Sequence, residues 1–250
     1  MSGRGVIVLG SSPIGAAIGE AFAAAGDVPY CIARDRPPSG VFAGWSEADC
    51  ARSGAAGDAV REAMAALPSL DVLVLAAASM PVASAAGTSD EQWDQAIRDG
   101  LTSAFNLVRE CLPRLPEGGS IVAVGSTNSF LSAPGLAAYA AAKAGLDGLI
   151  RQVALDYGCL GIRANIVAPA LISEGERGAV AEGYPLGRVG HPRDVAGAVV
   201  FLASAGAGFI TGVTVPVDGG LSIASPAAYL SPNLRARFPR RPDAVEEVSC

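Results

Sequence analysis

The chain has 250 residues, which is enough for one large α/β domain with a sizeable buried core. Its formal net charge of −6, without a block of Lys and Arg before the C-terminus, argues against a nucleic-acid-binding face. No uninterrupted apolar stretch reaches the roughly 20 residues that a membrane-spanning helix needs, so the sequence predicts a soluble protein.

Short apolar runs alternate with helical patterns along the chain. Strands are predicted at residues 6–9, 28–33, 72–76, 121–124, 163–167 and 213–217. Helices are predicted at residues 16–25, 58–67, 91–112, 139–157 and 193–203. Strands that alternate with helices and end at Gly/Pro turns favour a parallel sheet covered on both faces. With right-handed crossovers this is a single Rossmann-type, doubly wound α/β sheet of about seven strands.

The first strand leads into the segment Gly10-Ser11-Ser12-Pro13-Ile14-Gly15 and then into a helix. A strand, a glycine-containing turn and a helix start direct backbone N–H groups and the helix N-terminus at a phosphate. The sequence therefore predicts a phosphate-binding turn here.

The other end of the chain has a different composition. Residues 1–224 carry the α/β pattern, whereas residues 225–250 are rich in Pro and Arg and end in an acidic patch. We expect this tail to be disordered or to lie at a subunit interface.

Cysteine and histidine usage limits the chemistry further. Five widely spaced cysteines form no Cys-x-x-Cys pair, and no signal peptide is evident, which indicates reduced thiols and a cytoplasmic location. With His191 as the single histidine, a multi-histidine metal site cannot be built, and no metal site is expected. His191 precedes Pro192, a pattern typical of a helix start.

Tyr139 and Lys143 form the most informative pair in the chain. They are four residues apart in a predicted helix and therefore share one of its faces. A nearby cation favours the phenolate, which makes tyrosine a better proton-transfer group near neutral pH. Ser126 follows the predicted strand 121–124, and its hydroxyl could hold a substrate carbonyl against the phenol.

These features, in this order, resemble the short-chain dehydrogenase/reductase family over nearly the whole chain, to about Ile223. The segments that carry the resemblance are Leu9 to Gly15, Asp71 to Val74, Trp93-Asp94, Ser126, Tyr139, Lys143, Ala168-Pro169-Ala170, Pro185 to Arg188, Phe201 to Ser204, Ile210-Thr211-Gly212 and Val217 to Gly220.

The resemblance implies a nicotinamide dinucleotide and hydride transfer between its ring and a carbonyl or an alcohol. Tyr139 would protonate the alkoxide, Lys143 would lower the Tyr139 pKa and bond the ribose, and Ser126 would orient the carbonyl oxygen. It also implies a homotetramer or homodimer. The cofactor-binding residues carried over are Gly10, Ser12, Pro13, Ile14, Arg34, Asp49, Cys50, Ala76, Ala77, Tyr139, Lys143, Pro169 and Ile172.

The end of the second predicted strand indicates the choice of cofactor. A carboxylate there would bond the adenosine ribose and repel a 2′-phosphate, but the chain has Ala33 followed by Arg34. An adjacent guanidinium favours the additional phosphate, so we expect NADPH rather than NADH. Asp35, which follows, acts against this preference.

Four departures from the family pattern fall at function-bearing positions. Pro13 removes an N–H from the glycine turn, and residues 75–78 read Leu-Ala-Ala-Ala where the family has Asn-Asn-Ala-Gly. Gly100 stands where the family has an asparagine that holds a relay water, with Asn106 and Asn128 as candidate substitutes. Glu174 replaces a threonine that contacts the carboxamide, a role that Ser173 could take.

Two functional hypotheses remain open from the sequence. The first is an NADPH-dependent ketoreductase with an altered proton relay, of the kind that secondary metabolism uses. It would act on a small, mainly apolar substrate. The second is a non-redox reaction on the same scaffold (isomerisation, dehydration or cyclisation), or binding without turnover. Residues 173–184 are expected to form a lid, and the apolar pocket is expected to be lined by Met80, Phe130, Leu131, Leu136 and Leu171.

Overall fold

The computed structural model of the chain describes residues 3–175, 182–225 and 232–236. Within them lies one seven-stranded parallel sheet, in the order β3-β2-β1-β4-β5-β6-β7. The strands are β1 (Gly5–Leu9), β2 (Val28–Ala33), β3 (Trp45–Glu47), β4 (Val72–Leu75), β5 (Ser120–Val124), β6 (Arg163–Pro169) and β7 (Thr214–Val217). The predicted doubly wound α/β fold is confirmed.

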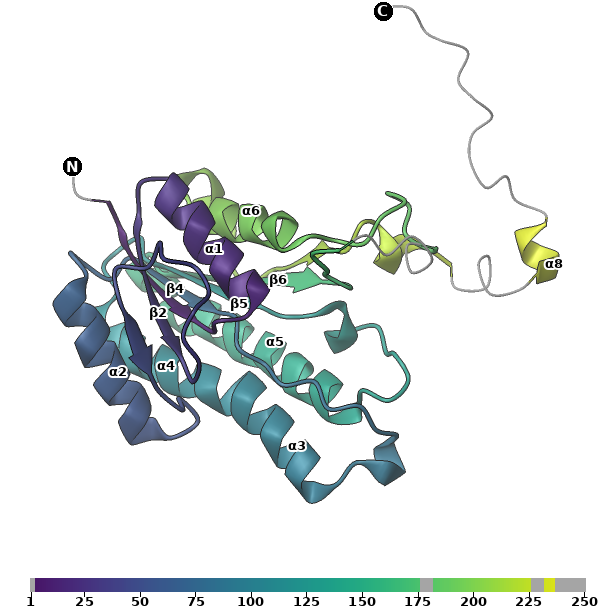
Figure 1. Cartoon of the computed structure of the whole chain (residues 1–250). Helices are drawn as coiled ribbons and strands as arrows, with labels where there is room; N and C mark the ends of the chain where they lie inside the picture. Colours follow the sequence, from purple (N-terminus) through teal and green to yellow (C-terminus); the bar gives the residue numbers. More distant parts are fainter. Residues whose placement is uncertain (1–2, 176–181, 226–231, 237–250) are drawn as a thin grey trace, which may run out of the picture.

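Helices cover both faces of this sheet (Figure 1). Helices α1 and α6 lie together on one face, and α2, α4 and α5 cover the other. Their bounds are α1 (Pro13–Ala24), α2 (Ser53–Ala66), α3 (Asp90–Ile97), the π-helical turn η2 (Arg98–Thr102), α4 (Ser103–Cys111), α5 (Ala137–Tyr157), α6 (Pro192–Ala203) and α8 (Pro232–Arg235). Short 3₁₀ turns are η1 (Ala85–Gly87), η3 (Leu112–Arg114), η4 (Thr127–Ser129), η5 (Gly158–Leu160), η7 (Ala205–Ala207) and η8 (Leu221–Ile223).

The core consists of two apolar layers, one on each face of the sheet. Alternate residues of β1 enter different layers: Val6 and Val8 pack under α1 and α6, whereas Ile7 and Leu9 pack toward α2 and α4. Every residue of β1 is buried, which explains why the central strands are continuous apolar runs in the sequence.

The predicted helix 91–112 is three consecutive segments, α3, η2 and α4. Trp93 and Phe105 are each 45% exposed, whereas the small residues Ala96 and Ala104 are buried. A Cβ atom at Gly100 would lie 3.2 Å from the Cβ of Ala142 on α5. Small residues therefore form this close contact between the helices, whereas Val108 in the same helical stretch is buried in the core.

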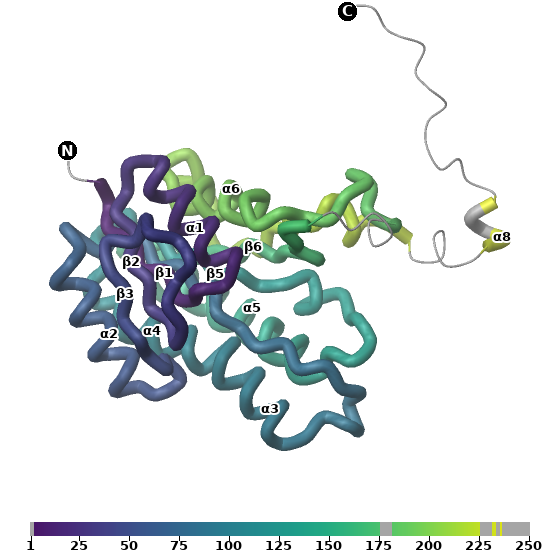
Figure 2. The backbone as a smooth tube through the Cα atoms, in the orientation of Figure 1, coloured from purple at the N-terminus to yellow at the C-terminus, as the bar shows by residue number. Residues whose placement is uncertain are grey.

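The ends of the chain contribute little to the described structure. Most of residues 225–250 lie outside the described residues, and α8 is a single turn that stands apart from the domain (Figures 1 and 2). The predicted division at residue 225 stays a prediction. None of the helices in the described ranges is long and apolar enough to cross a membrane.

The connection from β1 to α1 is a tight glycine turn. Gly10 has a φ of 115°, a conformation that only glycine adopts readily. Ser12 caps α1 and accepts a hydrogen bond from the Gly15 N–H at 3.3 Å, with Pro13 in the first helical turn. A Cβ atom at Gly15 would lie 2.2 Å from the Gly10 carbonyl oxygen, so a side chain at Gly15 would force the turn apart.

The substitution Gly15→Ala is expected to lower the free energy of unfolding by about 2 kcal/mol, because the added methyl group meets backbone that cannot move away cheaply. The matched control is Gly148→Ala on the exposed side of α5, where an added Cβ has no neighbour within 4 Å. That change should instead stabilise the protein by about 0.5–1 kcal/mol. Urea denaturation of both variants measures the difference, and equal stabilities would contradict the tight turn.

Candidate active site

A large cavity opens at the carboxyl ends of the parallel strands, the edge at which open α/β sheets bind ligands. Its volume is about 1370 Å³, which exceeds the range usual for a single drug-sized ligand. Its walls come from the glycine turn, from the segments after β2, β3, β4, β5 and β6, and from the first turns of α5.

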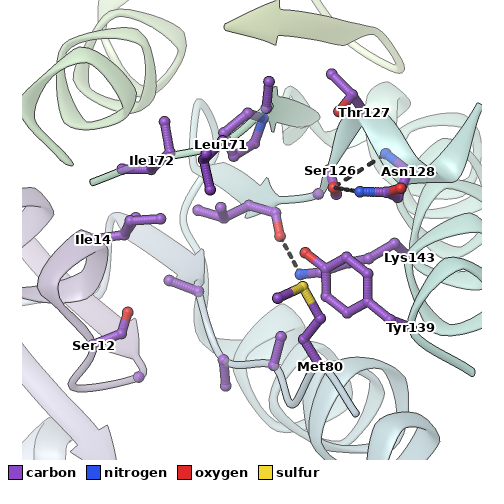
Figure 3. A pocket seen from close by; sticks show the side chains of 18 of the residues that line it. Ser12, Ile14, Met80, Ser126, Thr127, Asn128, Tyr139, Lys143, Leu171 and Ile172 are labelled. Atoms are coloured by element: carbon purple, nitrogen blue, oxygen red, sulfur yellow. Dashed lines mark hydrogen bonds between the residues drawn. The ribbon is translucent and has the colours of Figure 1, made fainter. Parts of the chain in front are cut away.

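Ser126, Tyr139 and Lys143 meet in this cavity, as the sequence predicts. Figure 3 shows the Tyr139 hydroxyl and the Lys143 ammonium side by side on α5, with Ser12 and Ile14 on the opposite wall. Ser126 caps η4 just beyond β5 and lines the cavity together with Tyr139. The Ser126 Oγ also accepts hydrogen bonds from the Asn128 N–H at 3.1 Å and from Nδ2 at 3.3 Å.

Lys143 is the most deeply buried charged group of the site, with 2% of its surface exposed. Its Nζ donates to the Val124 carbonyl oxygen at 2.6 Å and lies 5.7 Å from the centre of the Tyr139 ring. Burial lowers the Lys143 pKa from 10.5 to about 8, although the Asp147 carboxylate acts in the opposite direction. The amine can therefore exchange protons near neutral pH.

The structure does not show the expected lowering of the Tyr139 pKa. Burial raises the pKa of the Tyr139 phenol above its usual value, and the nearby Ser126 hydroxyl opposes this only in part. Lys143 does not offset the effect, because its ammonium is directed at the Val124 carbonyl and its own charged form is disfavoured by burial.

Asp147 is a site residue that the sequence reasoning missed. It is one turn beyond Lys143 on α5 and only 8% exposed, and it accepts a hydrogen bond from Ser129 Oγ at 3.0 Å. The Ser129 hydroxyl also contacts the Ser126 carbonyl oxygen at 2.9 Å, so Asp147 braces the turn that presents Ser126. Burial raises the Asp147 pKa, while Ser129 and Lys143 act against the rise. Asp147 follows Lys143 by four residues on the same helix, and this spacing could have identified it as a neighbour of the lysine.

The predicted cofactor-binding residues, except Pro13, line the cavity. They are Gly10, Ser12, Ile14, Arg34, Asp49, Cys50, Ala76, Ala77, Tyr139, Lys143, Pro169 and Ile172. Their assignment to a cofactor stays a prediction. Pro13 is not among the described lining residues and has no N–H, and the Gly15 N–H is bonded to Ser12. Of the first three helical residues, Ile14 is therefore the one whose N–H can bind a phosphate.

Arg34 is held by an acidic partner that the sequence reasoning also missed. Its Nη2 contacts Asp99 Oδ2 at 2.7 Å, and the Ser79 hydroxyl donates to the same oxygen. A second ion pair joins Arg98 to Asp49 at 2.9 Å. Asp99 is a buried acidic residue. Its position close to the buried Ala96 and Gly100 on the same helix was the sequence feature that could have pointed to a buried carboxylate with a cationic partner.

The candidates to replace the missing relay asparagine have other partners. Asn106 donates to the Cys50 carbonyl at 2.8 Å and to the Ala51 carbonyl at 3.2 Å, which ties α4 to the loop after β3. Asn128 bonds to Ser126. Gly100, packed against Ala142, offers no side chain to hold a water.

The expected apolar pocket is largely present. Met80, Leu131, Leu136 and Leu171 line the cavity. Phe130 does not line it and is 48% exposed, because the chain leaves η4 before that residue and the ring falls outside the wall. In the predicted lid, residues 176–181 lie outside the described residues. Glu174 and Ser173 are not among the described lining residues, and Tyr184 is the lid residue that accepts a hydrogen bond from the Leu171 N–H at 3.2 Å.

Comparisons with known proteins agree with this geometry. A family model described as enoyl-(acyl carrier protein) reductase matches residues 10–222. The 3-oxoacyl-[acyl-carrier-protein] reductase of Rickettsia felis is 37% identical over 164 residues, which cover 62% of this chain and 68% of that protein.

Solved structures are similar over most of the chain. The ligand-free aldohexose dehydrogenase of Thermoplasma acidophilum superposes with a TM-score of 0.84 and 29% identity, covering 90% of this chain and 96% of that one. A blue fluorescent protein from a metagenomic library, solved in complex with NADPH, has a TM-score of 0.80 and 29% identity, covering 88% and 98%. Together with the Ser126–Tyr139–Lys143 arrangement, these matches show that the chain belongs to the short-chain dehydrogenase/reductase family of oxidoreductases.

Proposed function

We propose that the protein is a cytoplasmic, NADPH-dependent reductase that converts the ketone of a small, mainly apolar substrate to an alcohol. The observation that carries this proposal is the meeting of Ser126 and Tyr139 beside the buried Lys143, inside a cavity large enough for a dinucleotide and a substrate.

The residues present fit a dinucleotide. A Cβ atom at Gly10 would lie 3.0 Å from the Ala76 carbonyl group, so glycine keeps the floor of the cavity open beside the turn. The Ile14 N–H and the N-terminus of α1 would hold the phosphates, and Lys143 would bond the ribose. When bound, the dinucleotide supplies the hydride.

Proton transfer belongs to the chain's own residues. Ser126 Oγ would hold the carbonyl oxygen, and Tyr139 would donate the phenolic proton to that oxygen as negative charge develops on it. A phenol whose pKa is raised by burial is protonated at neutral pH, which suits an acid rather than a base. Lys143, with a pKa of about 8, is the adjacent group that can return a proton to Tyr139.

Support for NADPH comes from the segment after β2. Ala33 provides no carboxylate at the strand end, and Arg34, with 56% of its side chain exposed, lines the cavity. The metagenomic relative was solved with NADPH, which supports the same choice.

Apolar side chains in the cavity support a ketone substrate, and apolar side chains on the surface support assembly. Met80, Leu131, Leu136 and Leu171 form the wall beyond Tyr139. The Rickettsia relative is named for the reduction of a 3-oxoacyl group, which is also a ketone. We further propose a homotetramer or homodimer, because large apolar side chains are exposed on α3, α4 and α6 and just beyond η7: Trp93, Phe105, Phe201 and Phe209.

A non-redox reaction on the same scaffold is the second candidate. It is favoured by Gly100, which has no side chain to hold a relay water, and by the bonds that Asn106 and Asn128 make to other partners. A substrate that is consumed without oxidation of NADPH would identify this alternative.

Replacing Tyr139 by Phe is expected to lower kcat for NADPH-dependent ketone reduction about 10³-fold, because it removes the general acid. Binding of NADPH, measured by quenching of tryptophan fluorescence, should be nearly unchanged. The matched control is Tyr157→Phe at the end of the same helix, which should retain activity. A Tyr139→Phe variant that still reduces ketones at the wild-type rate would exclude the proposed mechanism.

The variant Arg34→Ala should weaken NADPH binding about tenfold, the loss expected for one hydrogen bond to a charged group, and leave NADH binding within about twofold. Arg36→Ala is the matched control, since Arg36 also lines the cavity but lies over the Trp45 ring, 6.0 Å from its centre. Equal losses for both dinucleotides in Arg34→Ala would contradict a contact with the 2′-phosphate.

The variant Lys143→Met should be inactive and should differ from the wild type in the pH dependence of its stability. Below pH 8 the wild type bears the full cost of burying the ammonium, about 3 kcal/mol for a pKa lowered from 10.5 to about 8. Between these two values the unfolded state holds more protons than the folded one, so wild-type stability rises with pH. The stability of Lys143→Met relative to the wild type should therefore fall by about 3 kcal/mol from pH 7 to pH 10.5 in urea denaturation. A constant difference would show that Lys143 is not desolvated.

A further inference from the structure

Two ion pairs join the strand-end loops to the helix at one end of the cavity. Arg34, directly after β2, contacts Asp99 of η2, and Asp49, after β3, contacts Arg98 of the same turn. Arg34, Asp49 and Asp99 all line the cavity. They lie at the end where β2 and the glycine turn would hold the adenosine half of a dinucleotide.

The two members of the Arg34–Asp99 pair are held very differently. The Asp99 side chain is 8% exposed, and its Oδ2 accepts hydrogen bonds from both Arg34 and Ser79. The Arg34 side chain is 56% exposed and has water available to it. The carboxylate is therefore the fixed partner, and the guanidinium is the partner that can leave when another anion competes for it.

We propose that Asp99 is a specificity-determining residue, which sets how strongly the protein prefers the 2′-phosphorylated dinucleotide by competing with the 2′-phosphate for Arg34. The inference rests on the proposed function. A family member that prefers NADH places a carboxylate at the end of β2, a position that is Ala33 here. This chain instead presents a carboxylate from η2, in contact with Arg34.

The competition has a definite direction. A 2′-phosphate must displace Asp99 from the guanidinium and then remains near a buried carboxylate of the same sign, and both effects weaken its binding. A dinucleotide with a free 2′-hydroxyl meets neither cost. Asp99 therefore reduces, without abolishing, the preference for NADPH that Arg34 creates.

The other carboxylates near Arg34 do not compete in this way. Asp49 is bonded to Arg98 and accepts the Ala51 N–H at 3.1 Å. Asp35 lines the cavity and favours the charged form of Arg34 through space, less strongly than Asp99, to which Arg34 is hydrogen-bonded. Asp35→Asn removes the same charge without breaking the pair, and it is therefore the matched control.

The test measures binding of adenosine 2′,5′-bisphosphate and of 5′-AMP by isothermal titration calorimetry. Neither probe has a nicotinamide ring, so turnover does not enter the measurement. Asp99→Asn keeps an acceptor for Ser79 and removes the charge. It should bind the bisphosphate about tenfold more tightly than the wild type does, with 5′-AMP changed less than about twofold. Asp35→Asn should improve bisphosphate binding by less than about threefold.

A double-variant comparison isolates the pair. In an Arg34→Ala background the competition for the guanidinium is gone. Asp99→Asn should therefore raise the logarithm of the bisphosphate affinity by at most half of the increase that it gives in the wild-type background. The inference would be overturned if Asp99→Asn left the ratio of the bisphosphate affinity to the 5′-AMP affinity unchanged, or if Asp35→Asn increased the bisphosphate affinity as much as Asp99→Asn does. Asp99→Ser serves the same purpose should Asp99→Asn fail to fold. A wild type that binds neither probe nor NADPH would instead refute the proposed function itself.

Discussion

The hydrogen bond from Lys143 to the Val124 carbonyl is the contact on which the rest of the site depends. It joins α5 to the end of β5 across the core, at the position where the chain turns toward Ser126. Because the ammonium is buried, its charged form is costly, and the same burial gives it a pKa near 8. Burial therefore accounts for both the place of the ammonium and its lowered pKa. Asp147 braces the Ser126 turn through Ser129.

Much of the fold and the central site could be predicted from the sequence. The strands are continuous apolar runs because both faces of the parallel sheet are covered, and this pattern is readable without a structure. Ser126, Tyr139 and Lys143 meet because a strand end and an i, i+4 pair on the next helix place them at the same edge of the sheet. His191 caps α6 and accepts the Arg193 N–H at 3.3 Å, as its position before Pro192 indicated.

The features that were not predicted depend on contacts between distant segments. Trp93 and Phe105 are exposed although they recur at helical spacing, and the close contact of η2 with α5 is made by glycine and alanine. Arg34 was interpreted as free for a phosphate, because nothing in the sequence shows that Asp99 reaches it across the cavity. The Tyr139 pKa depends on a balance between burial and partners that spacing alone does not give.

Cys50, on the wall of the cavity, has a chemical consequence of its own. Burial raises the pKa of its thiol to about 12, and Cys31 behind the glycine turn has the same value. A thiol of this kind remains protonated at neutral pH and is a weak nucleophile. Among the described residues Cys50 is the sulfhydryl that borders the cavity, so its thiol should react slowly with electrophilic carbonyl compounds or Michael acceptors that enter this chamber.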